Sequence, residues 1–306
     1  MEVCKELIKL AKEVRSKKAT LYIVGGYVRD SILGLSNSDI DITSSLSQED
    51  LLAICSKLKI KTHNINKHLG TLQLVFNDIK FEYTRFRQES YLKRGTHTPD
   101  KVEFVDDINI DCLRRDFSIN SIYYDILADK FIDPVNGIHD IKKKIIRTTN
   151  QPNITLQDDG VRILRAIRFA HLLGFKIEKN TMRNLRIYTP LLKEISKERI
   201  LKELTQLVVA DLKYNKDSKH LLKYLNKLSL PSYIFNSSLN RMRKFSRKDK
   251  LAFYSLNMDA RLMGLYILIL KNYFKGYSPD NQLSYTINML LGINGIKESN
   301  DITSHT

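Results

Sequence analysis

Two acidic residues near the amino terminus have the spacing that metal-dependent phosphoryl transfer requires. Asp39 and Asp41 stand on either side of Ile40, and alternation along a strand would turn both carboxylates to one face. Such carboxylates repel each other unless cations neutralise them, and Mg²⁺ prefers hard oxygen ligands together with substrate phosphates. Two ions of this kind can activate an attacking hydroxyl and stabilise a leaving pyrophosphate. The spacing therefore predicts that Asp39 and Asp41 bind two Mg²⁺ ions.

A pair of glycines precedes these acids, at the end of an apolar stretch. Gly25 and Gly26 let the backbone approach a ligand closely, and Arg29 follows in an expected short helix. The amides at the start of that helix, with the Arg29 guanidinium, suit phosphate oxygens. Taken alone, the glycine pair indicates a turn and the Asp-x-Asp pair a solvated loop. In this order and spacing, the two together indicate a triphosphate site.

The residues from Val24 to Thr43 resemble the head domain of class II tRNA nucleotidyltransferases and bacterial poly(A) polymerases, within the polymerase-beta superfamily. Two later runs extend the resemblance. Residues 113–122 (LRRDFSINSI) are similar to the second motif of that family, and residues 133–137 (DPVNG) are similar to the hairpin exit that follows it.

This resemblance implies that the Arg-Arg-Asp run binds the ribose and the triphosphate of a nucleotide. Asp116 can accept a hydrogen bond from a 2′-hydroxyl and so select ribonucleotides, while Arg115 and Asn120 can donate to phosphate or sugar oxygens. The structural alternative is a buried salt bridge, because Arg-Asp pairs often only hold loops together.

The run from Asp158 to Ala170 resembles the amino-acid template with which the family reads the incoming base. Cytosine and adenine both present an amine beside a ring-nitrogen acceptor, so Asp159 can accept from the amine while Arg162 donates to the acceptor. Arg165 and Arg168 lie on nearly the same helical face as Arg162 and join the expected nucleotide-binding set. An all-structural arrangement of these charges at a helix start is also available.

The template run departs from the usual family pattern at two positions. Asp158 stands where the family commonly has Glu, and Gly160 stands where it commonly has Pro. Both departures leave Asp159 and Arg162 in place.

Three further features are open to two interpretations. Glu82, on an expected strand, is a candidate third carboxylate facing the metals, and a cross-strand ion pair with a basic residue would explain it equally well. Arg199 and Glu203 resemble the residues that brace the base-reading helix in the family, but at a spacing of four they also suit an exposed pair within one helix. The basic residues of 241–250 suit either a tRNA backbone or a solvated loop.

Hydrophobic periodicity places these residues on elements. It predicts a helix over 2–14 and another over 27–33, and strands over 20–24, 40–43, 71–76 and 79–86. Apolar residues then recur at helical spacing over 161–175, 200–212 and 251–274. We therefore expect an α+β fold with a mixed sheet followed by helices. Together with the resemblance, this implies a polymerase-beta-like nucleotidyltransferase head (1–150), a helical neck that recognises the base (151–236) and a helical body or tail that binds tRNA (237–306).

The bulk composition agrees with a nucleic-acid partner without requiring one. The 306 residues contain 50 Lys and Arg against 34 Asp and Glu, a formal charge of +16 that attracts polyanions. The 3 cysteines form no C-x-x-C spacing, which disfavours structural zinc and suits a reducing compartment. The apolar run at 262–270 is too short to cross a bilayer. These features favour a soluble, cytoplasmic protein.

The resemblance as a whole implies template-independent addition of C and A to the 3′ end of tRNA, with CTP and ATP as substrates and Mg²⁺ as cofactor. A CC-adding or A-adding specialist and a poly(A) polymerase share the same motifs. The poly(A) polymerases usually carry Lys-Asp-Phe-Asp, whereas this chain has Ser-Asp-Ile-Asp at 38–41, which favours tRNA. A catalytically silent RNA-binding module is the non-enzyme alternative, and the retention of two mutually repelling carboxylates argues against it.

Overall fold

The computed structural model describes residues 1–92, 95, 99–214, 220–234 and 253–254. These residues divide into two compact units, of which the first comprises Met1–Asp158 with Lys176–Thr181, and the second comprises Asp159–Phe175 with the residues from Met182 onward. The expected tail at 237–306, including the helix over 251–274 and the basic cluster at 241–250, lies outside the described residues apart from positions 253 and 254.

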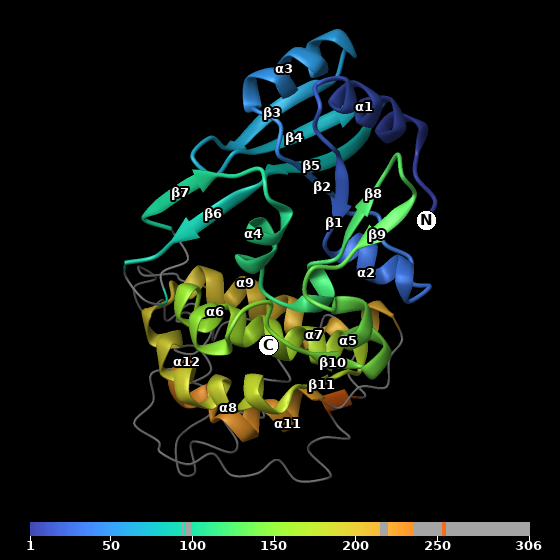
Figure 1. Ribbon diagram of the computed structural model, residues 1–306. Helices are drawn as coiled ribbons and strands as arrows, with labels where there is room; N and C mark the ends of the chain where they lie inside the picture. The colour runs from blue at the N-terminus through green and yellow to red at the C-terminus, as the bar shows by residue number, and fades with distance from the viewer. Residues whose placement is uncertain (93–94, 96–98, 215–219, 235–252, 255–306) are drawn as a thin grey trace, which may run out of the picture. The chain divides into compact units, whose positions relative to one another are not determined.

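A mixed, seven-stranded sheet forms the centre of the first unit, in the order β3-β4-β5-β2-β1-β8-β9 (Figure 1). Within it β2 and β5 are parallel, and all the other neighbouring strands are antiparallel. The strands are β1 (Tyr22–Val24), β2 (Ile40–Ser44), β3 (Lys61–Asn66), β4 (Thr71–Phe76), β5 (Ile79–Arg85), β8 (Tyr123–Asp125) and β9 (Lys130–Ile132).

The first unit also contains elements outside this sheet. Two pairs of strands lie outside it: β6 (Arg87–Ser90) with β7 (Lys101–Phe104), and β10 (Ile145–Ile146) with β11 (Lys176–Ile177). The helical elements are α1 (Lys5–Ser16), α2 (Gly26–Ile32), α3 (Gln48–Lys57), α4 (Ile108–Leu113), the 3₁₀ turn η1 (Ser118–Asn120), α5 (Gly137–Lys143) and α6 (Pro152–Asp158).

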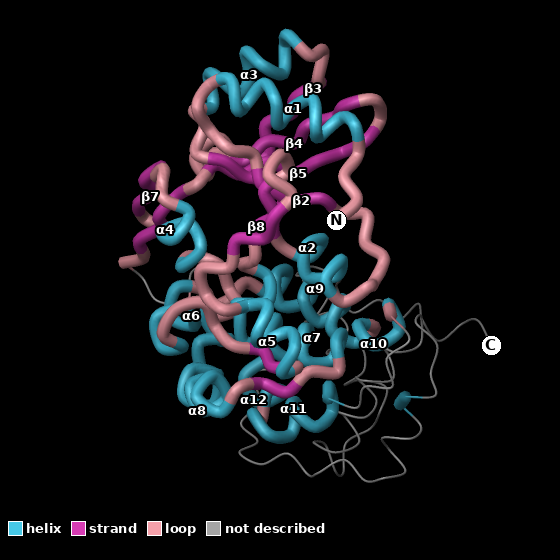
Figure 2. The backbone as a smooth tube through the Cα atoms, turned by 45° about the vertical axis from the view of Figure 1, so that its right-hand side comes forward, coloured by secondary structure: helices cyan, strands magenta, loops and turns pink. Residues whose placement is uncertain are grey.

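Alternation of buried and exposed side chains gives the sheet two different faces. Leu72 and Leu74 of β4 and Phe81 and Tyr83 of β5 are at most 2% exposed, and α1 and α3 pack together over one face of the sheet (Figures 1 and 2). The intervening residues of β5, among them Glu82, point the other way. One face of the sheet therefore forms the core, and the other carries the polar residues of the site.

Helices make up most of the second unit. They are α7 (Arg162–Leu173), α8 (Lys179–Tyr188, which begins in the first unit), the 3₁₀ helix η2 (Thr189–Glu194), α9 (Lys197–Val208), α10 (Ala210–Lys213), α11 (His220–Leu228) and α12 (Leu230–Ile234). The core is continuous along α7, where Ile163, Leu164 and Ile167 are completely buried.

The expected fold class, a mixed-sheet head followed by helices, is confirmed. Strand β4 has the expected bounds, and the turn at Asn77 and Asp78 has positive φ at both residues, as a tight hairpin requires. Hydrophobic periodicity does not predict strands β3, β6, β7, β8 and β9, because each is short or mostly exposed. Within the part of the chain that the structure describes, no helix has the length and apolar character needed to cross a bilayer.

Candidate active site

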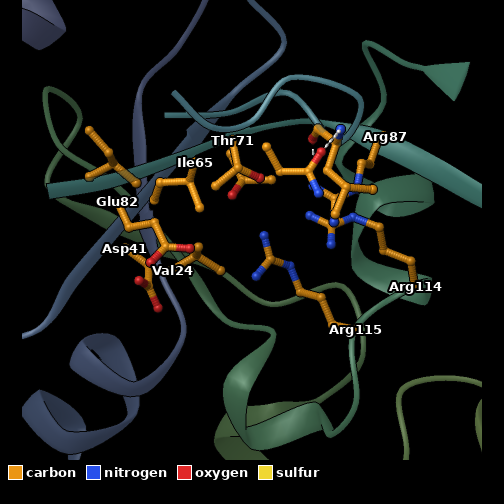
Figure 3. Close-up of a pocket in the computed structure, with 12 residues that line it drawn as sticks. Val24, Asp41, Ile65, Thr71, Glu82, Arg87, Arg114 and Arg115 are labelled. Carbon is orange, nitrogen blue, oxygen red and sulfur yellow. Dashed lines mark hydrogen bonds between the residues drawn. The ribbon is translucent and has the colours of Figure 1, made fainter. Parts of the chain in front are cut away.

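Two carboxylates meet on the polar face of the sheet in the first unit. Asp41 of β2 and Glu82 of β5 are register partners on neighbouring parallel strands, so their side chains project from the same face at adjacent positions. Both line one pocket of about 400 Å³ (Figure 3). The structure thus brings Glu82 beside one of the two aspartates of the Asp-x-Asp pair.

Gly25 lies directly against Asp41, one member of this pair. Its φ of +85° belongs to a region that other residues rarely adopt, and a Cβ added there would stand 2.9 Å from Oδ2 of Asp41. Two independent constraints, backbone conformation and the nearby carboxylate, therefore require glycine at the turn between β1 and α2.

Asp39 occupies a different place from Asp41. It is exposed, comes just before β2 begins, and is absent from the residues that line the pocket. Its backbone N–H donates to Oδ1 of Asn37, and Nδ2 of Asn37 in turn donates to Asp30. Its role as a metal ligand stays a prediction.

Three arginines face the two carboxylates across the pocket: Arg87, Arg114 and Arg115 (Figure 3). Arg87 comes from the start of β6, whereas Arg114 and Arg115 follow helix α4 directly. Sequence reasoning included Arg114 and Arg115 through the Arg-Arg-Asp run and missed Arg87, because nothing local in the chain indicates that β6 and the end of α4 converge.

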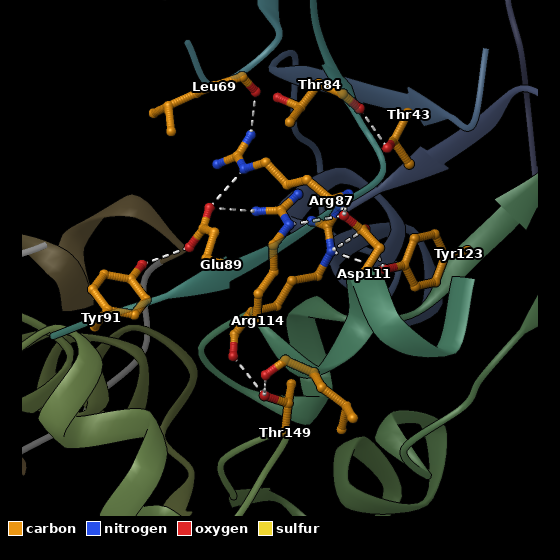
Figure 4. A network of polar contacts seen from close by, with 12 residues as sticks. Thr43, Leu69, Thr84, Arg87, Glu89, Tyr91, Asp111, Arg114, Tyr123 and Thr149 are labelled. Atoms are coloured by element: carbon orange, nitrogen blue, oxygen red, sulfur yellow. Dashed lines mark hydrogen bonds and ion pairs between the residues drawn. The ribbon is translucent and has the colours of Figure 1, made fainter. Parts of the chain in front are cut away.

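A buried carboxylate holds two of these arginines. Asp111 is completely buried, and it accepts hydrogen bonds from Nε of Arg114 (2.8 Å), Nη2 of Arg115 (3.0 Å) and the hydroxyl of Tyr123 (2.7 Å) (Figure 4). It also accepts the backbone N–H of Arg87 at 3.2 Å. Burial by itself would raise the pKa of Asp111, but the attraction of Arg114 and Arg115 holds that pKa well below its usual range.

Glu89 is the second acid of this network. It accepts from Nε of Arg87 at 2.6 Å, forms an ion pair with Arg114 at 3.7 Å and accepts from the hydroxyl of Tyr91 at 2.5 Å (Figure 4). Arg87 also donates to the carbonyl oxygen of Leu69 at 2.8 Å. The three guanidinium groups are therefore held by two acids that sequence reasoning missed, Glu89 and Asp111.

A separate buried chain of hydrogen bonds joins the other expected nucleotide-binding residues. Arg29 donates through Nε and Nη2 to both carboxylate oxygens of Asp30 (2.8 and 2.9 Å) and through Nη1 to Oδ1 of Asn120 (2.6 Å). Nδ2 of Asn120 then donates to Asp116 at 3.3 Å. This chain links α2 to η1, and none of its members lines the pocket. Arg115 therefore lines the pocket, whereas Asp116 and Asn120 belong to the buried chain outside it.

The residues expected to read the base lie in the second unit, close to a neighbouring helix. Asp159 precedes α7 and accepts from Nη2 of Arg199, at 3.2 and 3.1 Å from its two oxygens. It also accepts the backbone N–H of Val161 at 3.1 Å. Both Asp159 and Arg162 are less than a tenth exposed.

The last arginine of the motif has a second partner on α9. The Arg168 guanidinium makes a short charge-assisted contact with Glu203 and lies 4.5 Å from the centre of the Phe169 ring, above which Arg165 also lies at 5.4 Å. Arg199 and Glu203 of α9 thus each contact one residue of the run from Asp158 to Ala170. These are the contacts that the bracing interpretation expects.

The donor set of the pocket fits magnesium. Two adjacent carboxylates supply hard oxygen ligands, and Mg²⁺ is usually held by one or two carboxylates together with substrate phosphates. Within the described residues, no group of three or more His, Cys, Asp or Glu side chains is gathered as an all-protein metal cage.

Two protein-family models match parts of this chain. Residues 21–147 match the family model of the poly A polymerase head domain, and residues 174–235 match the model described as the probable RNA and SrmB-binding site of polymerase A. A mixed-sheet head of this kind, followed by helices, is the fold of the polymerase-beta-like nucleotidyltransferases.

Two individual relatives are both CCA-adding enzymes. The chain is 36% identical over 205 residues to the CCA-adding enzyme of Ligilactobacillus salivarius (strain UCC118), a match that covers 67% of this chain and 49% of that protein. It is 37% identical over 200 residues to the CCA-adding enzyme of Staphylococcus aureus (strain Newman), covering 65% and 48%. The chain thus spans about half the length of these relatives.

Solved structures show the same fold. The Bacillus stearothermophilus CCA-adding enzyme in complex with CTP matches with a TM-score of 0.69 and 25% identity, over 94% of this chain and 69% of that one. A tRNA nucleotidyltransferase complexed with a primer tRNA and an incoming ATP analog matches with a TM-score of 0.69 and 23% identity, over 90% and 78%. The chain belongs to the family of class II CCA-adding enzymes and poly(A) polymerase heads.

Proposed function

We propose that this protein adds C and A nucleotides to the 3′ end of tRNA by template-independent nucleotidyl transfer. The observation that carries the proposal is the Asp41–Glu82 register pair beside Gly25, in a chain whose family includes CCA-adding enzymes. In the reaction the 3′-hydroxyl of the RNA gives up its proton to solvent and its oxygen bonds to the α-phosphorus of the nucleotide. The bond from that phosphorus to the oxygen that bridges the α- and β-phosphates breaks, and pyrophosphate leaves.

Asp41 and Glu82 would hold magnesium, with Asp39 as the further ligand that the sequence predicts. Bound there, magnesium would lower the pKa of the attacking hydroxyl and neutralise charge on the triphosphate. The task of the protein is then to place the carboxylates. The parallel register of β2 and β5 fixes their spacing, and Gly25 leaves room beside Asp41.

The nucleotide set that we propose has two parts. Gly25, Gly26 and Arg29 at the start of α2, with Arg115, serve the phosphates. Asp116 and Asn120 serve the ribose, where a carboxylate accepting from a 2′-hydroxyl would select ribonucleotides. The buried chain from Arg29 through Asn120 to Asp116 supports this division, because it fixes the ribose residues relative to the glycine turn.

Selection of the base is proposed for Asp159 and Arg162, with Arg165 and Arg168 in support. Uracil and guanine place a carbonyl oxygen where a carboxylate needs a donor, and a bidentate contact of this kind discriminates by about 1–3 kcal/mol. The contact of Asp159 with Arg199 supports the role, since it holds a buried carboxylate in one orientation.

The experiment offers the protein tRNAs that end before, within and after the CC sequence, with labelled CTP or ATP supplied singly and together. Incorporation of both nucleotides that stops after one A supports CCA addition. Incorporation of CTP alone, of ATP alone, or of long A tails identifies a CC-adding enzyme, an A-adding enzyme or a poly(A) polymerase. If a folded protein incorporates neither nucleotide, the proposal is wrong and the RNA-binding alternative stands.

A further inference from the structure

Strand pairing fixes the position of Asp41 but does not extend to Asp39. Strand β2 begins at Ile40, and its pairs with β1 and β5 fall between Ile40 and Ser44. Asp39 comes one residue earlier and is exposed. An exposed side chain on an unpaired segment keeps conformational freedom that binding a metal would remove. A contact that fixes the backbone of Asp39 would lower this cost.

The side-chain amide of Asn37 makes such a contact. Its Oδ1 accepts the backbone N–H of Asp39 at 3.2 Å, which is the two-residue spacing of an Asx turn. Its Nδ2 donates to Oδ2 of Asp30 at 2.8 Å. This half-buried side chain therefore ties the segment before β2 to helix α2, which bears Asp30.

Asp30 is a rigid anchor for the amide. It is completely buried, and its two carboxylate oxygens accept from Nε and Nη2 of Arg29 at 2.8 and 2.9 Å. Arg29 is itself 3% exposed and donates to Asn120 as well. A carboxylate in a bidentate pair with a guanidinium has a defined orientation. The position of Asp30 is thus fixed by contacts that do not involve Asn37.

The amide of Asn37 also lies beside the glycine turn. A Cβ added to Gly26 would stand 3.4 Å from Nδ2 of Asn37 and 3.6 Å from Nη2 of Arg29. The preceding residue, Gly25, lies against Asp41. Asn37 therefore lies in the part of the first unit that carries the proposed phosphate-binding residues and the Asp-x-Asp pair.

We infer that Asn37 is a positioning residue, which holds the backbone of Asp39 to the buried pair of Asp30 and Arg29 and so orients the Asp39 carboxylate for metal. The inference rests on the proposed function, in which Asp39 is a metal ligand. A turn that only stabilised the loop would need the contact with Asp39 but not the contact with Asp30. Removal of residues that orient metal ligands typically weakens metal binding by about 10- to 100-fold.

The test uses Mn²⁺ as the probe of the metal site. Its binding is followed by electron paramagnetic resonance with CTP present and RNA absent, after subtraction of the Mn²⁺ that CTP alone binds. We expect Asn37→Ala to bind Mn²⁺ about tenfold more weakly than the wild type. Asn37→Ser keeps a hydroxyl that can accept the N–H of Asp39 but lacks the amide that donates to Asp30. It should weaken Mn²⁺ binding by a similar factor.

A double-mutant cycle with Asp39→Asn shows whether Asn37 acts through Asp39. If it does, adding Asn37→Ala to Asp39→Asn should change the Mn²⁺ affinity by less than about twofold. Asn109→Ala is the matched control, since Asn109 is exposed and its amide donates to Asp107 at 2.8 Å. The control should keep the wild-type affinity, and melting temperatures show whether each variant folds.

Two results would overturn the inference outright: wild-type Mn²⁺ affinity in a folded Asn37→Ala protein, or equal losses from Asn37→Ala with and without Asp39→Asn. Wild-type affinity in Asn37→Ser would assign the effect to the turn alone and overturn the role of Asp30 as anchor. An unchanged affinity in Asp39→Asn would reject the metal role of Asp39, which belongs to the proposed function. Failure of the wild type to incorporate nucleotides would reject that function separately, because the binding measurements do not need catalysis.

Discussion

Asp41 of β2 and Glu82 of β5 are register partners across two parallel strands, although 40 residues (42–81) lie between them in the chain. Parallel neighbours present the side chains of paired residues to the same face. The two carboxylates consequently line one pocket, with Gly25 against Asp41 on the side of β1.

Neutralising either member of this pair should stop nucleotide incorporation. We expect Asp41→Ala and Glu82→Gln each to lower kcat/KM by about a thousandfold, because several kcal/mol of metal-derived stabilisation depend on the carboxylates. Rates of labelled CTP incorporation, with Mg²⁺ varied, measure the effect. Glu103→Gln is the control, since Glu103 is an exposed acid of the same unit that pairs with Lys101. Normal activity in Asp41→Ala would refute the metal assignment.

Substitutions of two glycines can separate the effect of backbone strain from the effect of contact with Asp41. Gly25 and Gly34 both have positive φ, but a Cβ on Gly25 would approach Asp41 while a Cβ on Gly34 would meet nothing within 4 Å. We expect Gly25→Ala and Gly34→Ala each to lose about 1–2 kcal/mol in free energy of unfolding, the cost of left-handed backbone. Only Gly25→Ala should also lose activity, by about a hundredfold, because it displaces Asp41. Equal activities in the two variants would contradict this account.

Base selection should depend on the contact between α9 and the start of α7. Arg162→Ala should reduce the preference for CTP over UTP by about 5- to 150-fold, the equivalent of one bidentate contact. Arg199→Ala should reduce it in the same direction but less, because Asp159 loses its partner while Arg162 remains. Competition between labelled nucleotides measures the ratio. Lys202→Ala, an exposed position on the same helix, is expected to keep the wild-type preference.

The buried acid Asp111 should make stability depend on pH in the acid range. Its pKa is lower in the folded protein than in the unfolded chain, so its contribution is complete above the unfolded value of about 3.9 and is lost as the pH falls towards the folded value. Asp111→Asn should therefore cost about 3–5 kcal/mol of unfolding free energy at pH 7. The difference from the wild type should shrink below about pH 4. Denaturant titrations at pH 7 and pH 3 measure it, and an equal difference at both would exclude this role.

The residues that the sequence could identify are those whose chemistry is encoded locally. Spacing alone brings Asp41 onto a strand after a Gly-Gly turn, and periodicity places Asp159 and Arg162 at the start of a helix. A mixed-sheet region and a helical region after it follow from the same local patterns, and the structure confirms this order. The polymerase-beta-like character of the head follows from the resemblance of its motifs.

Tertiary structure decided the partners of these residues. The position of Glu82 opposite Asp41 depends on the parallel register of β2 and β5, and the convergence of Arg87 with Arg114 depends on where β6 meets α4. Asp111 and Glu89 likewise acquire their roles only through arginines brought to them by folding. Register and long-range ion pairs join segments that are distant along the chain, and no local pattern of residue types specifies them. The sequence thus determined the kind of chemistry, and the fold determined which side chains surround it.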